Sequence, residues 1–262
     1  MAYTPQIELV TDFPIAYESQ DHLVPWGTRR DNSQNPAFNG KLYRLFSELN
    51  RPLRVLDLGC SGGGFVRDCI NDGCLAVGIE GSDYSRKMKR AEWAYLADSF
   101  LFTADITKPF RVTDRESRDP LKFDVITSWE VLEHLEERDI PALISNVRNH
   151  LNPDGVFVAS ISYVSDFVQG VELHRTIKMK DWWLSLFKQH ALHDMPGAEN
   201  YFNTQYVRGP KQQAPGSFHV CLSPRADATR SFPSLTFRDR ILDAWYFSKP
   251  HRVIRKLVTM RD

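Results

Sequence analysis

The stretch Arg54–Phe65, with the sequence RVLDLGCSGGGF, constrains the fold of this chain more than any other. An apolar run ends near the acid Asp57, and a glycine-rich turn then leads into a predicted helix. Glycines allow positive φ angles and a close approach of the backbone, and the first turn of a helix offers free N–H groups. By itself the turn predicts a site for a small cofactor in an α/β protein, without saying which cofactor.

Three more predicted strands follow the turn along the sequence. One apolar run ends at Glu80, the next ends before Asp105, and a third leads into the sequence SWEVLEH that closes at His134. Strands are predicted near residues 53–58, 75–80, 99–103, 122–128 and 155–162, with Ser217–Ser223 as a candidate last strand, and helices near 37–49, 63–73, 83–96, 137–151 and 178–191. Strands and helices that alternate in this way predict a parallel sheet with helices on both faces.

This series of motifs resembles the class I S-adenosylmethionine (SAM) dependent methyltransferases over roughly residues 51–161. The resemblance implies a Rossmann-like three-layer α/β sandwich with a mostly parallel sheet of about seven strands, and it implies SAM as the cofactor. Ser61 stands where the family usually has its second glycine, and a serine is small enough for that position. A dinucleotide-binding enzyme would carry Gly-x-Gly-x-x-Gly, a pattern that the residues from Gly59 to Gly64 fit poorly.

The resemblance also assigns residues to the cofactor. Glu80 is expected to accept hydrogen bonds from both ribose hydroxyls, because a carboxylate offers two acceptor oxygens. Asp105 resembles the acid that faces the adenine amino group, with Ile106 packed beside the ring. An exposed acid at the strand end and an Asx turn or helix cap are the competing interpretations of Glu80 and Asp105. The other expected cofactor residues are Asp57, Gly59, Ser61, Gly63 and Ser128.

A second group of polar residues follows the fourth strand. Glu130, Glu133 and His134 have spacings of three and four, which place them on one side of a helix predicted to begin there. The carboxyl ends of the strands, where α/β proteins bind ligands, lie at the same place. A similar Glu-x-x-Glu-His block in metal-dependent O-methyltransferases holds a divalent cation, and a downstream histidine in those enzymes matches His174. The resemblance therefore implies Glu130, Glu133, His134 and His174 as candidate ligands for Mg²⁺ or another divalent cation.

Two other interpretations of this block stay open. Methyltransferases without a metal carry a similar Val-Leu-Glu-His-Leu, in which the first glutamate only lines the cavity and the histidine is a candidate base. His134 would then act in catalysis with Glu130 beside it, since an unperturbed histidine pKa near 6.5 suits proton transfer at neutral pH. A purely structural role of the block is the third interpretation.

The two ends of the chain are expected to differ from the centre. Residues 1–36 are predicted to form an irregular arm or lid, residues 37–223 the methyltransferase domain, and residues 224–262 a helical basic extension. Arm residues that could contact the acceptor or SAM are His22, Trp26, Thr28, Arg29 and Arg30. The basic residues of the C-terminal tail are His251, Arg252, Arg255, Lys256 and Arg261.

The composition limits the partners and the compartment. Lysine plus arginine equals aspartate plus glutamate at 33 each, so no overall charge draws the chain toward long nucleic acids. The four cysteines are spaced unlike a metal site or a disulfide framework. No apolar run approaches the roughly 18 residues of a membrane span, and the N-terminus does not resemble a signal peptide. We therefore expect a cytoplasmic protein with reduced thiols.

Together these observations predict an enzyme, a SAM-dependent methyltransferase. The simplest acceptor is a hydroxyl of a small, polar, hydroxyl-rich molecule such as a saccharide or a natural-product intermediate. A 2′-O-methyltransferase that acts on RNA 3′ ends and a non-catalytic SAM-binding module that serves a partner are the alternatives. The sequence leaves the oligomeric state open.

Overall fold

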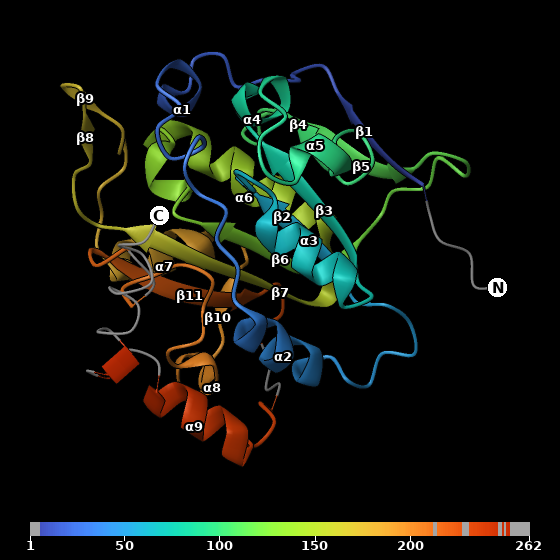
Figure 1. The fold of residues 1–262 in the computed structure, drawn as a ribbon, viewed down its shortest axis with the longest axis vertical. Coiled ribbons are helices and arrows are strands. Elements are labelled where there is room, and N and C mark those ends of the chain that lie inside the picture. The colour runs from blue at the N-terminus through green and yellow to red at the C-terminus, as the bar shows by residue number, and fades with distance from the viewer. Residues whose placement is uncertain (1–5, 212–213, 227–230, 246–247, 249, 252–262) are drawn as a thin grey trace.

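The computed structural model describes residues 6–211, 214–226, 231–245, 248 and 250–251. Its centre is a seven-stranded sheet with the strand order β10-β11-β7-β6-β2-β3-β4 (Figure 1). The strands are β2 (Arg54–Leu58), β3 (Leu75–Glu80), β4 (Leu101–Thr103), β6 (Phe123–Trp129), β7 (Leu151–Ser162), β10 (His193–Asp194) and β11 (Ser217–Ser223). The five strands from β7 to β4 are parallel, and β11 and β10 run antiparallel to their neighbours. The predicted mostly parallel sheet is confirmed.

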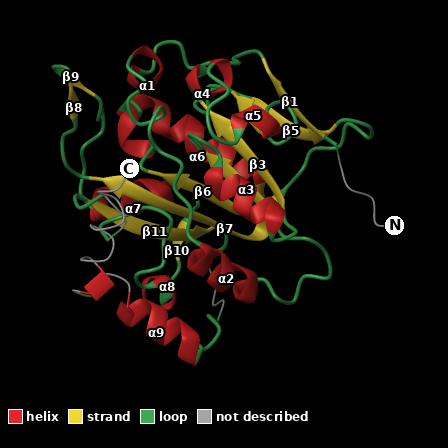
Figure 2. Ribbon diagram, in the orientation of Figure 1, coloured by secondary structure: helices red, strands yellow, loops and turns green. Residues whose placement is uncertain are grey.

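Helices cover both faces of this sheet, as the three-layer prediction requires (Figure 2). Successive residues of a strand point to opposite faces, so Leu56 and Leu58 join one apolar core while Val55 joins the other. On the first face lie α6 (Ile140–His150) and α7 (Lys180–Gln189), and on the second lie α2 (Pro36–Leu45), α3 (Gly64–Asn71) and α8 (Ala198–Phe202).

Two small pairs of strands lie outside the main sheet. The arm contributes β1 (Ile7–Thr11), which pairs antiparallel with β5 (Phe110–Asp114), and a short helix, α1 (Gln20–Leu23). The prediction of an irregular arm was therefore wrong for Ile7–Thr11 and Gln20–Leu23. The local sequence could not reveal β1, because its partner β5 lies far away in the sequence. A hairpin of β8 (Phe167–Val168) and β9 (Val171–Glu172) follows β7.

The helix predicted over residues 83–96 is broken in two. Its parts are α4 (Tyr84–Lys87) and α5 (Trp93–Leu96), and between them Lys89 and Ala91 both have a φ of 47°. A left-handed residue ends a right-handed helix. The turn directs the Arg90 guanidinium to the backbone oxygen of Asp31, at 2.6 Å. A contact between distant segments has overridden the local helical pattern.

The C-terminal part contains the predicted helix, α9 (Phe237–Trp245). Two ion pairs fix it to α2: Lys41 Nζ lies 3.0 Å from Asp243 Oδ2, and Arg44 Nη2 lies 2.7 Å from Asp239 Oδ1. The predicted basic residues Arg252, Arg255, Lys256 and Arg261 lie outside the described residues. The division into segments 1–36, 37–223 and 224–262 stays a prediction. Among the described residues, no helix has the length and apolar character needed to cross a membrane.

Candidate functional site

A cavity of about 780 Å³ lies at the carboxyl ends of β2, β3 and β6. The glycine turn, the ends of the strands, the N-terminal arm and the segment before β11 all contribute to its wall. It brings together eight of the predicted site residues: Gly59, Ser61, Glu80, Asp105, Ile106, Glu130, His134 and His174. The other four, Asp57, Gly63, Ser128 and Glu133, do not line it.

The glycine turn is shaped by close packing. Gly59 has a φ of 79°, and a Cβ added there would lie 2.3 Å from Val131 Cγ2. Gly63 has a φ of 86°, and its added Cβ would lie 2.6 Å from Leu101 Cδ1. Both positions need glycine on conformational and steric grounds. Gly63 therefore determines only the shape of the turn, whereas Gly59 also lines the cavity.

The arm crosses the glycine turn and closes one side of the cavity. Ser61 Oγ lies 3.1 Å from the backbone oxygen of Thr28 and 3.0 Å from that of Asp31. Asn32 Oδ1 accepts a hydrogen bond from the backbone N–H of Gly64 at 2.8 Å. The serine that replaces the family's usual second glycine thus has a structural role, because its hydroxyl reaches two backbone oxygens of the arm.

The structure separates the five arm residues that the sequence singled out. Trp26 and Thr28 line the cavity, whereas His22, Arg29 and Arg30 do not. The Arg30 guanidinium instead stacks on Trp26, 3.3 Å from the ring centroid. This contact packs the outer side of the arm.

Glu80 is buried in the cavity wall, with only 6% of its surface exposed. Its Oε2 accepts a hydrogen bond from Ser61 N at 2.7 Å, and its Oε1 accepts one from Ser82 N at 3.3 Å. Burial raises the pKa of this carboxyl to about 7, although the two backbone N–H groups oppose the shift. The interpretation of Glu80 as an exposed acid at a strand end is therefore wrong.

Asp105 lines the cavity. It also makes a local turn, which was the alternative explanation for an acid at this position. Its Oδ1 accepts hydrogen bonds from Thr107 N at 2.9 Å and from Thr107 Oγ1 at 2.6 Å. This is an Asx turn. Ile106 lines the cavity beside it.

Asp57 and Ser128 are buried and do not line the cavity. Asp57 Oδ1 accepts a hydrogen bond from Thr127 Oγ1 at 2.7 Å, and Ser128 Oγ donates one to the backbone oxygen of Leu58 at 3.0 Å. Burial raises the pKa of Asp57 to about 7. The side chains of these two residues thus join β2 to β6 just before the glycine turn.

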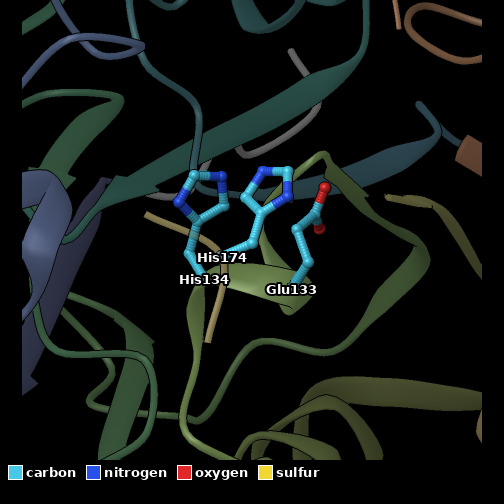
Figure 3. A group of neighbouring side chains, drawn as sticks. All are labelled: Glu133, His134 and His174. Atoms are coloured by element: carbon cyan, nitrogen blue, oxygen red, sulfur yellow. The ribbon is translucent and has the colours of Figure 1, made fainter. Parts of the chain in front are cut away.

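Glu133, His134 and His174 form a compact group in which one ligand atom from each lies within 4.8 Å of the others (Figure 3). The 3-10 turn η1 (Leu132–His134) supplies the first two, and the segment after β9 supplies His174. Glu133 is fully buried; its Oε1 accepts a hydrogen bond from Ser162 N at 2.9 Å, while its Oε2 has no hydrogen-bond partner among the described residues. His174 Nδ1 lies 2.5 Å from the backbone oxygen of Val164, which leaves its Nε2 available. A free carboxylate oxygen beside two imidazoles suits a divalent cation.

Glu130 is not one of the three clustered ligands, although its charge adds to the effect of burial in raising the pKa of Glu133. The prediction that a helix begins at Glu130 was wrong. Glu130 has a φ of 55°, and its N–H donates to the backbone oxygen of Ser160 at 3.0 Å. Without a helix, the three- and four-residue spacings no longer place Glu130 next to Glu133 and His134. Its side chain lines the cavity instead, and burial raises its pKa. The structure therefore brings three of the four candidate ligands together.

His134 has a partner in the arm that the sequence did not reveal. Its Nδ1 lies 3.0 Å from Asp21 Oδ2 in α1. Burial favours the neutral ring, but the acids around it, Asp21 first and then Glu133 and Asp166, together outweigh burial and raise the pKa of His134 to about 9. The ring is thus protonated at neutral pH in this arrangement. It becomes a base or a metal ligand only once it loses that proton.

A second ion pair also closes the arm over the cavity. Arg208 Nη1, from the segment before β11, lies 2.6 Å from Asp31 Oδ1. Both residues and Asp21 line the cavity. No local spacing pattern marked Asp21, Asp31 or Arg208. The density of polar residues in the arm was the only signal for the two acids, and nothing marked Arg208.

Comparison with known proteins yields a family and distant relatives. A family model described as a methyltransferase domain matches residues 32–201. The ubiquinone biosynthesis O-methyltransferase of Neisseria meningitidis serogroup C is 34% identical over 114 residues, which cover 43% of this chain and 45% of the relative. Its counterpart from Glaesserella parasuis serovar 5 is 32% identical over 129 residues, covering 47% and 50%. The chain spans about half the length of the curated relatives it matches.

Solved structures share the fold at low sequence identity. The 1,6-didemethyltoxoflavin-N1-methyltransferase of Burkholderia thailandensis, solved with 1,6-didemethyltoxoflavin and S-adenosylhomocysteine, is 16% identical with a TM-score of 0.51 and covers 77% of this chain and 83% of its own. A SAM-dependent methyltransferase from Clostridium acetobutylicum is 15% identical with a TM-score of 0.50, covering 78% and 95%. These likenesses concern the fold alone.

Proposed function

Since the chain belongs to the family of SAM-dependent methyltransferase domains, we propose that it methylates a hydroxyl of a small, polar, hydroxyl-rich acceptor. The observation that carries this proposal is the shared cavity. Its wall combines the glycine turn and Glu80 with His134 and His174. The residues that we assign to the cofactor and those that we assign to the acceptor thus face the same space.

The residues at the glycine turn fit the cofactor. SAM, when bound, supplies an electrophilic methyl group. We assign Glu80 to the ribose hydroxyls, because a carboxylate has about four lone-pair sites and the two backbone N–H bonds of Glu80 leave some of them free. We assign Asp105 and Ile106 to the adenine end, where both line the cavity.

The candidate cation site borders the cavity through His134 and His174, which line its wall, whereas Glu133 does not. We propose that Glu133, His134 and His174 hold Mg²⁺ or a similar divalent cation, which when bound lowers the pKa of a nearby hydroxyl. Glu133 suits this role because its Oε2 is buried without a partner in the described part of the chain. His134 must give up its proton in either case, because a protonated imidazole can neither bind a metal nor act as a base. His134 as the base, without a metal, is the alternative mechanism.

Three observations support the proposed class of acceptor. The two ubiquinone biosynthesis relatives are O-methyltransferases. A volume of about 780 Å³ is that of a small-molecule site. The equal numbers of acidic and basic residues give the chain no general attraction for a polyanion. A saccharide or a natural-product intermediate fits these supports better than an RNA end does.

Transfer of label from methyl-labelled SAM tests the proposed function. The acceptor panel should contain hydroxyl-rich small molecules, matched amines, and a short RNA with a free 3′ end. Label in a small hydroxyl compound supports the proposal, and label only in the RNA supports the 2′-O-methyltransferase. SAM binding without transfer to any acceptor would favour a binding module.

Replacing Glu80 by alanine should weaken SAM binding by about 1.5–3 kcal/mol, the scale for losing hydrogen bonds to a charged group. That loss corresponds to about 10- to 150-fold in the dissociation constant, measurable by titration calorimetry. Asp98→Ala is the matched control, because Asp98 is an exposed acid that does not line the cavity. Unchanged affinity in Glu80→Ala would remove the ribose assignment.

Removing divalent cations with a chelator should abolish turnover and leave SAM affinity nearly unchanged. The reason is that none of the three candidate ligands is assigned to SAM, so the cation would act on the acceptor. Adding Mg²⁺ back should restore turnover in the unchanged protein and much less in Glu133→Gln, which lacks the charged ligand. Full activity after exhaustive chelation would leave His134 as the only candidate base.

A further inference from the structure

The outer side of α9 carries large apolar residues that stay exposed. Phe237, Ile241 and Trp245 are 80%, 49% and 42% exposed. They are four residues apart, so they follow one another along the same side of the helix. A row of this kind on a protein surface marks a site of contact with another surface.

The charges of α9 are sorted between its two sides. Asp239 and Asp243 turn inward, where they pair with Arg44 and Lys41 of α2, and each acid side chain is only 7% exposed. Arg238 and Arg240 are exposed. The outward side of α9 is therefore aromatic and basic, without an unpaired carboxylate of the helix.

We propose that this side of α9 docks on a membrane surface that contains anionic lipids. Helices that lie in a membrane interface combine aromatic and aliphatic residues on one side with arginine or lysine nearby, and the basic groups meet the lipid phosphates. The sequence after α9 has the same character, since residues 246–262 contain one acid, Asp262, and the basic residues Lys249, His251, Arg252, Arg255, Lys256 and Arg261.

A second copy of the chain complements this surface less well. In a two-fold contact through α9, Arg238 and Arg240 of both copies would lie near one another. A stable interface also buries about 800 Å² on each partner, which is far more than three side chains of one short helix can supply. An anionic lipid surface instead attracts the arginines and accepts the apolar row without a matching groove.

The position of α9 keeps the cavity free when the chain is docked. α9 and α1 lie at opposite ends of the longest axis of the molecule (Figure 1), and Asp21 of α1 lines the cavity. The two ion pairs to α2 hold α9 in a fixed orientation on the folded domain. Docking through α9 would thus anchor the enzyme while the cavity stays open to its acceptor.

Co-sedimentation of the full chain with lipid vesicles tests this proposal. We expect binding to phosphatidylcholine vesicles that contain phosphatidylglycerol, binding at least about ten-fold weaker to phosphatidylcholine alone, and a decrease with added salt. The triple variant Phe237→Ser, Ile241→Ser and Trp245→Ser should bind the anionic vesicles at least about ten-fold more weakly. Arg238→Glu with Arg240→Glu should weaken binding as well.

Tyr95→Ser is the matched control, because Tyr95 is an aromatic residue on α5 with 86% exposure. It should bind vesicles like the unchanged chain, and circular dichroism should show that all variants are folded. Failure of the full chain to bind anionic vesicles would overturn the proposal, and so would full binding by the triple variant. Self-association that the triple variant abolishes, without vesicle binding, would assign the surface to a second copy.

Discussion

Replacing His134 by alanine should lower the turnover rate by about 10²–10⁴-fold, the usual scale for losing a proton-transfer group, while SAM affinity changes little. His134 lines the cavity next to His174, with ring centroids 4.7 Å apart. As a base it would remove the acceptor proton, and as a ligand it would hold the cation. Both proposed roles concern the acceptor, whereas Glu80 is assigned to the cofactor.

A structural role of His134 predicts a different outcome. The variant would then lose folding stability and keep its turnover per folded molecule. Melting temperature and turnover measured on the same preparation separate the two. His190→Ala is the matched control, since His190 ends α7 and does not line the cavity. A His134→Ala protein that is less stable but equally active would contradict both catalytic interpretations.

The pairing of His134 with Asp21 adds a pH test. The folded-state pKa of His134, about 9, lies above its ordinary value of 6.5. The raised pKa therefore adds stability that is fully present below pH 6.5 and is lost as the pH rises through 9. Asp21→Asn should lower the pKa, which NMR titration of the ring would show. If His134 must be neutral for turnover, the rising limb of the pH–rate profile should move to lower pH in this variant.

The parts of the molecule that the sequence predicted well depend on local patterns. Apolar runs that end at an acid marked β2 and β3, and they placed Glu80 at the end of its strand. The weak alternation of Ser217–Ser223 marked β11. Such signals need no knowledge of distant partners, because hydrophobic periodicity and turn residues act over a few positions.

The parts that the sequence did not predict depend on contacts between distant segments. β1 forms because residues 110–114 offer it an edge to pair with, and the helix at 83–96 breaks where Arg90 reaches the arm. Asp21 becomes a partner of His134 only after the arm folds back over the cavity. Glu130 was placed beside Glu133 by helical spacing, and its left-handed φ removed the helix on which that placement depended.

Replacing Asp243 by alanine should lower the free energy of unfolding by about 3–5 kcal/mol, the cost of breaking a buried ion pair from one side. Lys41 is fully buried in α2, and its Nζ lies 3.0 Å from Asp243 Oδ2 and 3.1 Å from the backbone oxygen of Phe202. Without Asp243, the ammonium group would keep one backbone partner and would lose its only ion pair among the described residues, leaving the charge of Asp239 as a non-bonded neighbour. Urea denaturation followed by circular dichroism measures the loss.

The double variant Lys41→Met with Asp243→Leu shows whether the uncompensated charge causes that loss. With both charges replaced by apolar side chains, the free energy of unfolding should decrease much less than in Asp243→Ala alone. Equal losses in the two variants would mean that Asp243 contributes through packing. Comparing the two variants thus separates the energetic effect of the buried charge from that of the packing contact between α9 and α2.

The pH dependence of Asp243→Ala gives an independent check. Burial already lowers the pKa of Lys41 below its ordinary value of 10.5, and Asp243 opposes that shift. Without Asp243 the pKa should fall further, so that between the lowered pKa and 10.5 the unfolded chain binds more protons than the folded one. The free energy of unfolding of Asp243→Ala should then rise with pH across that window relative to the unchanged chain. The Lys41→Met double variant has no such lysine and should show no relative rise, so a rise in both would assign the pH effect to other groups.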